Sequence, residues 1–168
     1  MSMQSNVLVS LSVVSAMLLT GTVVALTADD ARTALQGVWR TVEVVIQGPT
    51  PQTLRPGATL AIIYGTHYSR VEVHAEGALP GLKDPAAASA DELRAAWGPF
   101  VGEAGTFDVS DNVITMRATV AKNPAAMTNG ATSVFTFQRS GDTLTLTQVR
   151  TPSGPSPVPI TITLQRVE

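Results

Sequence analysis

The residues best suited to acid–base or metal chemistry lie together in one short segment. His74 is one of two histidines in the chain, and Glu72 and Glu76 flank it at a spacing of two. In a β-strand this spacing places all three side chains on one face, where they could form a carboxylate–imidazole cluster. His67 falls in a predicted turn, so the two imidazoles would need a third ligand nearby to hold one metal ion. We therefore interpret the segment as a solvated polar strand face and predict no metal site.

Other catalytic patterns are missing from the sequence. No serine stands in a Gly-x-Ser-x-Gly elbow, no glycine-rich phosphate loop is present, and the chain has no cysteine. Asp108 and Asp111 flank a predicted turn, where aspartate is common because its side chain bonds to nearby backbone. The sequence therefore predicts no cofactor and leaves catalytic residues unassigned.

Candidate ligand contacts are polar and aromatic residues within or beside the apolar runs, because alternate residues of a small barrel point into its lumen. Tyr64 and Tyr68 stand on either side of a predicted turn. Trp97 and Phe100 lie at the end of a predicted helix, where they could close the barrel mouth over a ligand or simply fill it. The sequence therefore predicts a ligand site that includes these four aromatic residues.

Arg150 completes the predicted ligand site. It has the same alternation phase as Leu144, Leu146 and Gln148, so a regular strand would point all four side chains into the lumen or toward its rim. Arg117 lies opposite an apolar face of Ile, Met, Ala and Val, and we expect it to be exposed to solvent. Of these two arginines, Arg150 is the predicted ligand contact.

Alternation of apolar and polar residues predicts a mainly β-strand chain, with Gly, Pro, Asn and Asp clusters between the runs. The predicted strands span residues 38–46, 58–64, 68–75, 107–109, 113–122, 131–138, 143–150 and 160–167. Within the first strand, we expect one side to carry Val38, Arg40, Val42, Val44 and Ile46. Eight consecutive strands predict an all-β, antiparallel up-and-down β-barrel.

One short helix is predicted between the third and fourth strands. Ser89 and Glu92 have the spacing of a capping box, in which each side chain bonds to the other residue's backbone. Leu93, Ala96 and Trp97 then form an apolar stripe, and a Gly-Pro pair ends the helix. A single helix beside eight strands is consistent with a lid or plug on a barrel.

Gly37, Trp39 and Arg166 are predicted to close one end of the barrel, which we call the barrel floor. The Gly-x-Trp motif opens the first strand, and the arginine lies in the last one. The guanidinium could cover the indole face, a cation–π contact worth roughly 0.5–2 kcal/mol, and donate to backbone carbonyls of the segment that precedes the first strand. These three residues are therefore expected to be structural rather than ligand contacts.

The first 28 residues contain no charged side chain and no histidine. The run from Val7 to Leu26 is uncharged, and Ala25, Thr27 and Ala28 offer small residues at which a peptidase could cut. A run of about 20 residues is also long enough to span a bilayer as a retained anchor. We expect residues 1–28 to be an export signal or an N-terminal membrane anchor. Residues 29–168 are then one domain, which is periplasmic or secreted in the first case and membrane-anchored in the second.

The charge composition limits the partners of this domain. The chain has 11 Lys and Arg residues against 13 Asp and Glu residues, for a net charge of −2. This balance predicts no nucleic-acid partner, and membrane contact only through an uncleaved N-terminal segment. The sequence does not determine the oligomeric state.

Several runs resemble the bacterial lipocalin-like domain family, and together they extend from residue 35 to residue 168. The matching pieces are Leu35–Arg40, Ile63–Ser69, the helix and aromatic residues Glu92, Trp97 and Phe100, Gly105-Thr106-Phe107, Asn123-Pro124, Gly141–Leu146 and Arg166. The chain departs from the family pattern at Ser69-Arg70-Val71, where a more apolar run is expected. The resemblance implies an eight-stranded calycin-type barrel, mostly without an assigned activity.

These observations support three functional hypotheses. The first is an exported barrel that binds a small apolar or amphipathic molecule without catalysis. The second is a barrel-type cyclase or isomerase, in which a few polar groups such as Tyr68 and Arg150 hold a small organic substrate in a reactive shape. The third is a structural or interaction protein whose lumen is filled by its own side chains. The volume of the lumen distinguishes the first two from the third.

Overall fold

The alternating sequence pattern folds into antiparallel strands joined mainly by tight turns. The computed structural model describes residues 27–75, 77 and 79–168. Its strands are β1 (Gly37–Ile46), β2 (Gln52–Leu54), β3 (Ala58–Tyr64), β4 (His67–Val73), β5 (Phe100–Ser110), β6 (Val113–Ala121), β7 (Ser133–Ser140), β8 (Thr143–Thr151) and β9 (Gly154–Arg166). The helices are α1 (Ala28–Leu35), α2 (Ala90–Trp97) and the 3-10 turn η1 (Pro124–Met127).

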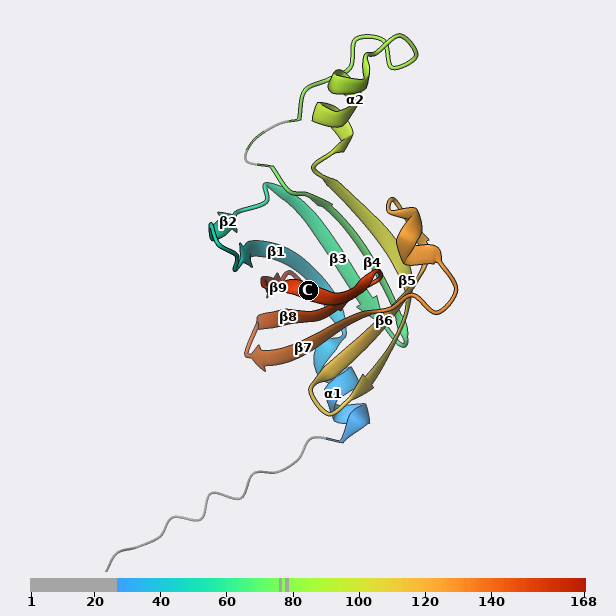
Figure 1. Ribbon diagram of the computed structural model, residues 1–168. Helices are drawn as coiled ribbons and strands as arrows, with labels where there is room; N and C mark the ends of the chain where they lie inside the picture. The colour runs from blue at the N-terminus through green and yellow to red at the C-terminus, as the bar shows by residue number, and fades with distance from the viewer. Residues whose placement is uncertain (1–26, 76, 78) are drawn as a thin grey trace, which may run out of the picture.

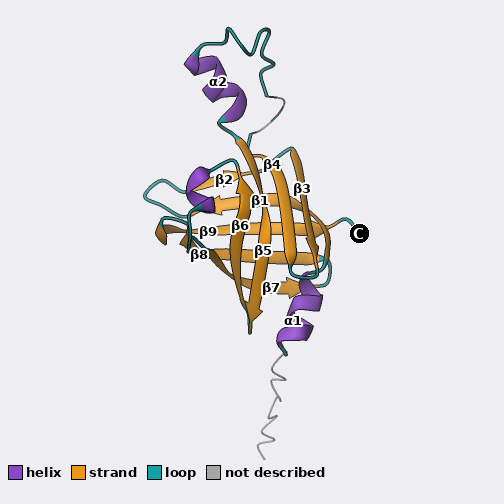
Figure 2. Cartoon of the chain, turned by 90° about the vertical axis from the view of Figure 1, so that its right-hand side faces the viewer, coloured by secondary structure: helices purple, strands orange, loops and turns teal. Residues whose placement is uncertain are grey.

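The long strands close into a barrel. Pairing follows the order β1-β3-β4-β5-β6-β7-β8-β9, and β9 pairs back with β1 to complete the ring. The ninth strand, β2, only extends one end of β1. Figure 1 shows α1 and α2 at opposite ends of this barrel, and Figure 2 shows the same arrangement from the side. The predicted all-β, eight-stranded antiparallel barrel is confirmed.

The helices differ in part from the prediction. The capping box of Ser89 and Glu92 is present at the start of α2. The helix was predicted between the third and fourth strands and lies between β4 and β5. The numbers differ by one because the three-residue strand β2 was not predicted. The helix α1 was not predicted, and β5 begins at Phe100 rather than at Phe107.

Among the described residues, no helix is long and apolar enough to cross a membrane. The predicted signal or anchor lies outside the described residues, apart from its last two.

The barrel floor is built as the sequence predicts. The Arg166 guanidinium carbon lies 4.5 Å from the centroid of the buried Trp39 ring, and Arg166 Nη2 donates to the carbonyl of Gln36 at 2.7 Å. Trp39 Nε1 donates to the carbonyl of Leu35 at 2.9 Å, which ties α1 to the barrel. Gly37 has a φ of +137°, and a Cβ there would lie 2.8 Å from the Glu168 carbonyl oxygen.

A β-bulge in β1 changes which side chains face the core. The pairing of β1 with β9 shifts between Thr41 and Glu43, so the alternation phase reverses there. Trp39 and Thr41 are buried before the bulge, and Val44 is buried after it. The expectation that Val38, Arg40, Val42, Val44 and Ile46 share one face is therefore wrong, because it assumed a regular strand.

Candidate functional site

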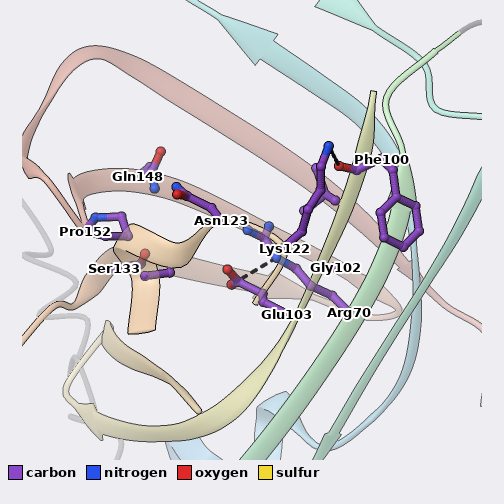
Figure 3. A pocket seen from close by; sticks show the side chains of 11 residues that line it. Arg70, Phe100, Gly102, Glu103, Lys122, Asn123, Ser133, Gln148 and Pro152 are labelled. Carbon is purple, nitrogen blue, oxygen red and sulfur yellow. Dashed lines mark hydrogen bonds and ion pairs between the residues drawn. The ribbon is translucent and has the colours of Figure 1, made fainter. Parts of the chain in front are cut away.

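A cavity of about 290 Å³ opens where β6 and β7 separate (Figure 3). Pairing between these strands stops at Met116 and Ser133, while β6 continues along β5 as far as Ala121. The turn η1 spans the gap. We call this space the mouth cavity; it is lined by Arg70, Phe100, Val101, Gly102, Glu103, Lys122, Asn123, Ala126, Ser133, Gln148 and Pro152.

An ion pair lies at the inner side of the mouth cavity. Arg70 on β4 is the register partner of Glu103 on β5, and Arg70 Nε donates to Glu103 Oε1 at 3.1 Å. Arg70 points inward because it lies between the buried residues Tyr68 and Glu72 at the two-residue spacing of a strand. Both side chains of the pair are mostly shielded from solvent, with exposed fractions of 23% and 12%.

Glu72 lies further inside and is 2% exposed. Its carboxylate accepts from the Thr41 hydroxyl at 3.0 Å and lies 2.5 Å from His74 Nε2. Burial alone would raise the pKa of Glu72, but the hydrogen bond with His74, the charges of Arg70 and His74, and the Thr41 hydroxyl together hold it below its ordinary value. Glu72 is therefore an ionised, fully bonded group inside the barrel.

This burial corrects the interpretation of residues 72–76 as a solvated strand face. Glu72 and His74 do form a carboxylate–imidazole pair, and the polar face points into the barrel rather than toward water. Glu76 lies outside the described residues. His67 is exposed at the opposite end of β4. Within the described residues, no group of three or more His, Cys, Asp or Glu side chains could hold a metal ion.

The rest of the lumen is filled by apolar side chains. A second space, which we call the inner cavity, has a volume of only about 30 Å³ and lies between Tyr68, Arg70 and Glu72 on one side and apolar core residues on the other. That volume holds about one or two water molecules. The core residues around it include Met116, Phe135, Leu146, Ile162 and Leu164. Arg70 lines both spaces, so it stands at the boundary between the mouth cavity and the filled core.

Lys122 fixes α2 to the rim of the mouth cavity. Its Nζ donates to the carbonyls of Gly98 at 3.1 Å and Phe100 at 2.8 Å, and also to the carbonyl of Trp97. Carbonyls at a helix C-terminus have no partner within the helix, and a cation placed there satisfies them and interacts favourably with the helix dipole. Much of the donor capacity of Lys122 is therefore used in holding the helix.

The predicted ligand contacts do not come together in one site. Tyr68 lies inside the barrel, where burial first and the charge of Glu103 second raise its pKa and keep it a neutral phenol. Tyr64 is 81% exposed at the floor end, beside the turn that Gln36 bonds to. Trp97 is 54% exposed on α2 and contacts Phe100 edge-on, with ring centroids 6.0 Å apart.

Phe100 lies at the edge of the mouth cavity, but its ring packs over Gly102. Gly102 pairs with the exposed Val71, so this is the outer face of the sheet. Figure 3 shows the ring directed away from Glu103. Arg150 is exposed, because a register shift between Gln148 and Arg150 reverses the strand phase. Gln148 lines the mouth cavity, whereas Arg150 is not among its lining residues.

Glu103 and Ser133 were not predicted to line a ligand site, and Arg70 and Gln148, which could point inward, were not chosen as ligand contacts. A signal for Glu103 exists in the sequence, since counting back by twos from the core residue Phe107 reaches Gly105 and then Glu103. That signal was lost because the fourth strand was predicted to begin at residue 107. Ser133 carries the same signal, because it lies two residues before the buried Phe135, but only the separation of β6 from β7 opens a space beside it.

No family model matches the chain, and no curated protein matches it. Among solved structures, a redesigned β-barrel is similar at 14% sequence identity, with a TM-score of 0.42, over 82% of this chain and 96% of that one.

Proposed function

We propose that this protein is a small-molecule binding barrel that takes an amphipathic ligand into the mouth cavity. The observation that carries the proposal is the mouth cavity itself, an open space of about 290 Å³ in a barrel whose lumen is otherwise filled. Ligand sites are typically concave, partly apolar and furnished with a few polar groups, and about 300 Å³ is the lower end of their usual size. The ligand is therefore small, on the scale of one ring with a polar substituent.

The polar side chains of the mouth cavity are available to such a ligand. Ser133 and Gln148 make no side-chain hydrogen bond to any described residue, while Asn123 uses only its oxygen, which accepts from the Ala125 amide at 3.1 Å. Unpaired amide and hydroxyl groups at the wall of an open cavity can orient a bound molecule.

Two parts of the proposal, the lipocalin-like binding role and export from the cell, rest on the sequence. The resemblance of residues 35–168 to the bacterial lipocalin-like domains agrees with a binding role, and the uncharged N-terminal run supports export to the periplasm or the medium, with membrane anchoring as the alternative. Intact mass measurement of the protein recovered from the producing cell and its medium tests cleavage near residue 28.

The filled lumen also supports the alternative of a structural or interaction protein. The core residues Phe107, Ile114, Phe135 and Leu144 leave no deep ligand site of the kind that larger barrels enclose. The two hypotheses differ in what they predict for the mouth cavity, because only the binding hypothesis requires a molecule to enter it.

Benzamide, a neutral amphipathic probe, tests the proposal by NMR titration of the ¹⁵N-labelled protein. Shift changes should gather at the amides of residues 102–103, 122–123 and 133. Ser133→Leu should abolish them by filling the cavity, whereas Ser140→Leu makes the same change at an exposed position on the same strand and should preserve them. Native mass spectrometry of freshly purified protein would reveal a retained natural ligand. If benzamide, benzoate and benzylamine all leave the mouth cavity unperturbed, the binding hypothesis is wrong.

A further inference from the structure

We infer that the ligand of the mouth cavity carries a carboxylate, or an equally compact planar oxyanion, and that Arg70 is the group that receives it. This inference rests on the proposed binding function and names the chemical class of its ligand. It follows from the hydrogen-bonding capacity that the mouth cavity leaves unused, together with the position of Arg70 at its inner end.

Arg70 keeps most of its donors free. A guanidinium has five N–H groups in a planar fork, and among the described residues Arg70 uses only Nε, toward Glu103 Oε1. The two Nη atoms bond to no described residue and are not fully buried. They are therefore open to solvent in the cavities that Arg70 lines. Figure 3 shows the side chain extending toward Glu103 from the β4 side.

The neighbouring side chains add further donors to the guanidinium, although some of them can also accept. The Asn123 oxygen is occupied by the Ala125 amide, which leaves its amide nitrogen for a ligand. Ser133 and Gln148 can each donate one or more hydrogen bonds as well as accept them. Glu103 supplies the main competing acceptor, through the oxygen that Arg70 does not bind. A ligand that presents two acceptor oxygens therefore matches this wall better than one that presents N–H groups.

The charge around Arg70 permits an anion. Arg70 and Glu103 carry no net charge as a pair, so a ligand anion competes with Glu103 for the guanidinium, and Glu72 is bonded to His74 and Thr41 on the core side. Lys122 adds a positive charge at the rim, although its Nζ bonds to the carbonyls after α2. A guanidinium fork binds a carboxylate through two parallel hydrogen bonds, which makes the contact stronger and more directional than a neutral one.

Three probes of nearly equal shape test the inference. Benzoate, benzamide and benzylamine share one ring and differ in whether the substituent is an anion, a neutral amide or a cation. We expect benzoate to bind at least about tenfold more tightly than benzamide, because a charge-assisted bidentate contact replaces neutral hydrogen bonds. Benzylamine should bind most weakly. The measurement is an NMR titration followed at residues 102–103 and 133, at one fixed pH and salt concentration.

Variants identify the receiving group. Arg70→Gln should remove the preference for benzoate over benzamide, while Arg150→Gln makes the same change at an exposed arginine outside the cavity and should leave it intact. Because Arg70→Gln unpairs Glu103 and can weaken folding, Glu103→Gln provides a second measurement. It replaces the competing carboxylate with a neutral amide, a weaker acceptor for Arg70, and should tighten benzoate binding relative to benzamide.

The outcomes separate this inference from the proposed function. If benzamide or benzylamine binds in the mouth cavity more tightly than benzoate, the carboxylate inference is overturned and the binding function stands. If benzoate is preferred but Arg70→Gln keeps the preference, Arg70 is not its receptor and the inference also fails. If no probe binds there, the proposed function itself fails.

Discussion

Arg70 and Glu103 face each other as register partners on β4 and β5, with Arg70 Nε 3.1 Å from Glu103 Oε1, at the boundary between the filled core and the mouth cavity. Ion pairs at a protein surface usually contribute little to stability, but this one is mostly shielded from solvent. Removing one partner would leave the other charge in a partly buried place, which is more costly than losing a surface pair. The same placement puts the pair in the wall of the mouth cavity, where a ligand can reach it.

Trp39→Ala should destabilise the protein by about 3–5 kcal/mol, because it empties the barrel floor and removes the cation–π contact with Arg166. Chemical denaturation followed by circular dichroism measures the free energy of unfolding. Trp97→Ala is the matched control, since this indole is 54% exposed, and it should cost far less. Equal losses for the two variants would contradict the structural role of Trp39.

Gly37→Ala should be more damaging than Gly154→Ala. Both glycines have nearly the same positive φ, +137° and +136°, so alanine meets backbone strain of about 1–3 kcal/mol at each position. Only at Gly37 would the new Cβ also collide, with the Glu168 carbonyl oxygen and the Arg166 guanidinium, whereas nothing lies within 4 Å at Gly154. The difference between the two unfolding free energies therefore reports the close packing of the floor, and no difference would refute it.

Glu72 should make the stability depend on pH in the acid range. Its pKa in the folded protein lies below the usual 4.5, so the folded state favours the ionised form more than the unfolded state does. The stabilising contribution is fully present above about pH 5 and is lost as the pH falls through 4.5 and below.

Glu72→Gln should lower the unfolding free energy near pH 7 and flatten its decline between about pH 5 and pH 3. Denaturant titrations at a series of pH values measure both effects. Glu43→Gln, which removes the partner of the exposed Arg55, is the control and should change the profile little. An unchanged slope in Glu72→Gln would show that this carboxylate is not the source of the pH dependence.

Lys122→Met should loosen α2 without unfolding the barrel. The substitution removes the donor that bonds to the carbonyls of Trp97, Gly98 and Phe100. Hydrogen exchange at the amides of residues 93–98 should accelerate, while the strands β7 and β8 keep their protection. Lys83→Met changes an exposed lysine in the loop before α2, and it should leave the exchange of α2 as in the parent protein.

Much of the architecture could be predicted from the sequence because its causes are local. Alternation located the strands, and the spacing of Ser89 and Glu92 located the start of α2. The pairing of Trp39 with Arg166 was also predictable, since the first and last strands of a closed barrel are neighbours. The helix α1 was missed because its eight residues follow directly on an apolar run that dominated the interpretation of the N-terminus.

The ligand site was less predictable because bulges decide which side chains face inward. One extra residue near Val149 turns Arg150 outward while Gln148 remains in the cavity, and a shift near Val42 divides β1 into two phases. No glycine or proline stands at Val42 or Val149 themselves, although the segment of β9 opposite Val149 contains Pro155, Pro157 and Pro159. Alternation counted along a regular strand therefore failed at these two positions. It also failed in β6, where a register shift with β5 leaves Val120 exposed.

The sequence by itself determined the strand pattern, the capped helix and the closed floor, since each depends on short-range spacing or on the neighbours that a ring of strands must have. Only the tertiary structure decided that Glu72 is buried, that Arg70 meets Glu103, and that β6 leaves β7 to open a cavity. These features depend on register between strands distant in sequence. A shift of one residue in that register moves the side chains of a strand from the core face to the solvent face. No local sequence pattern fixes the register.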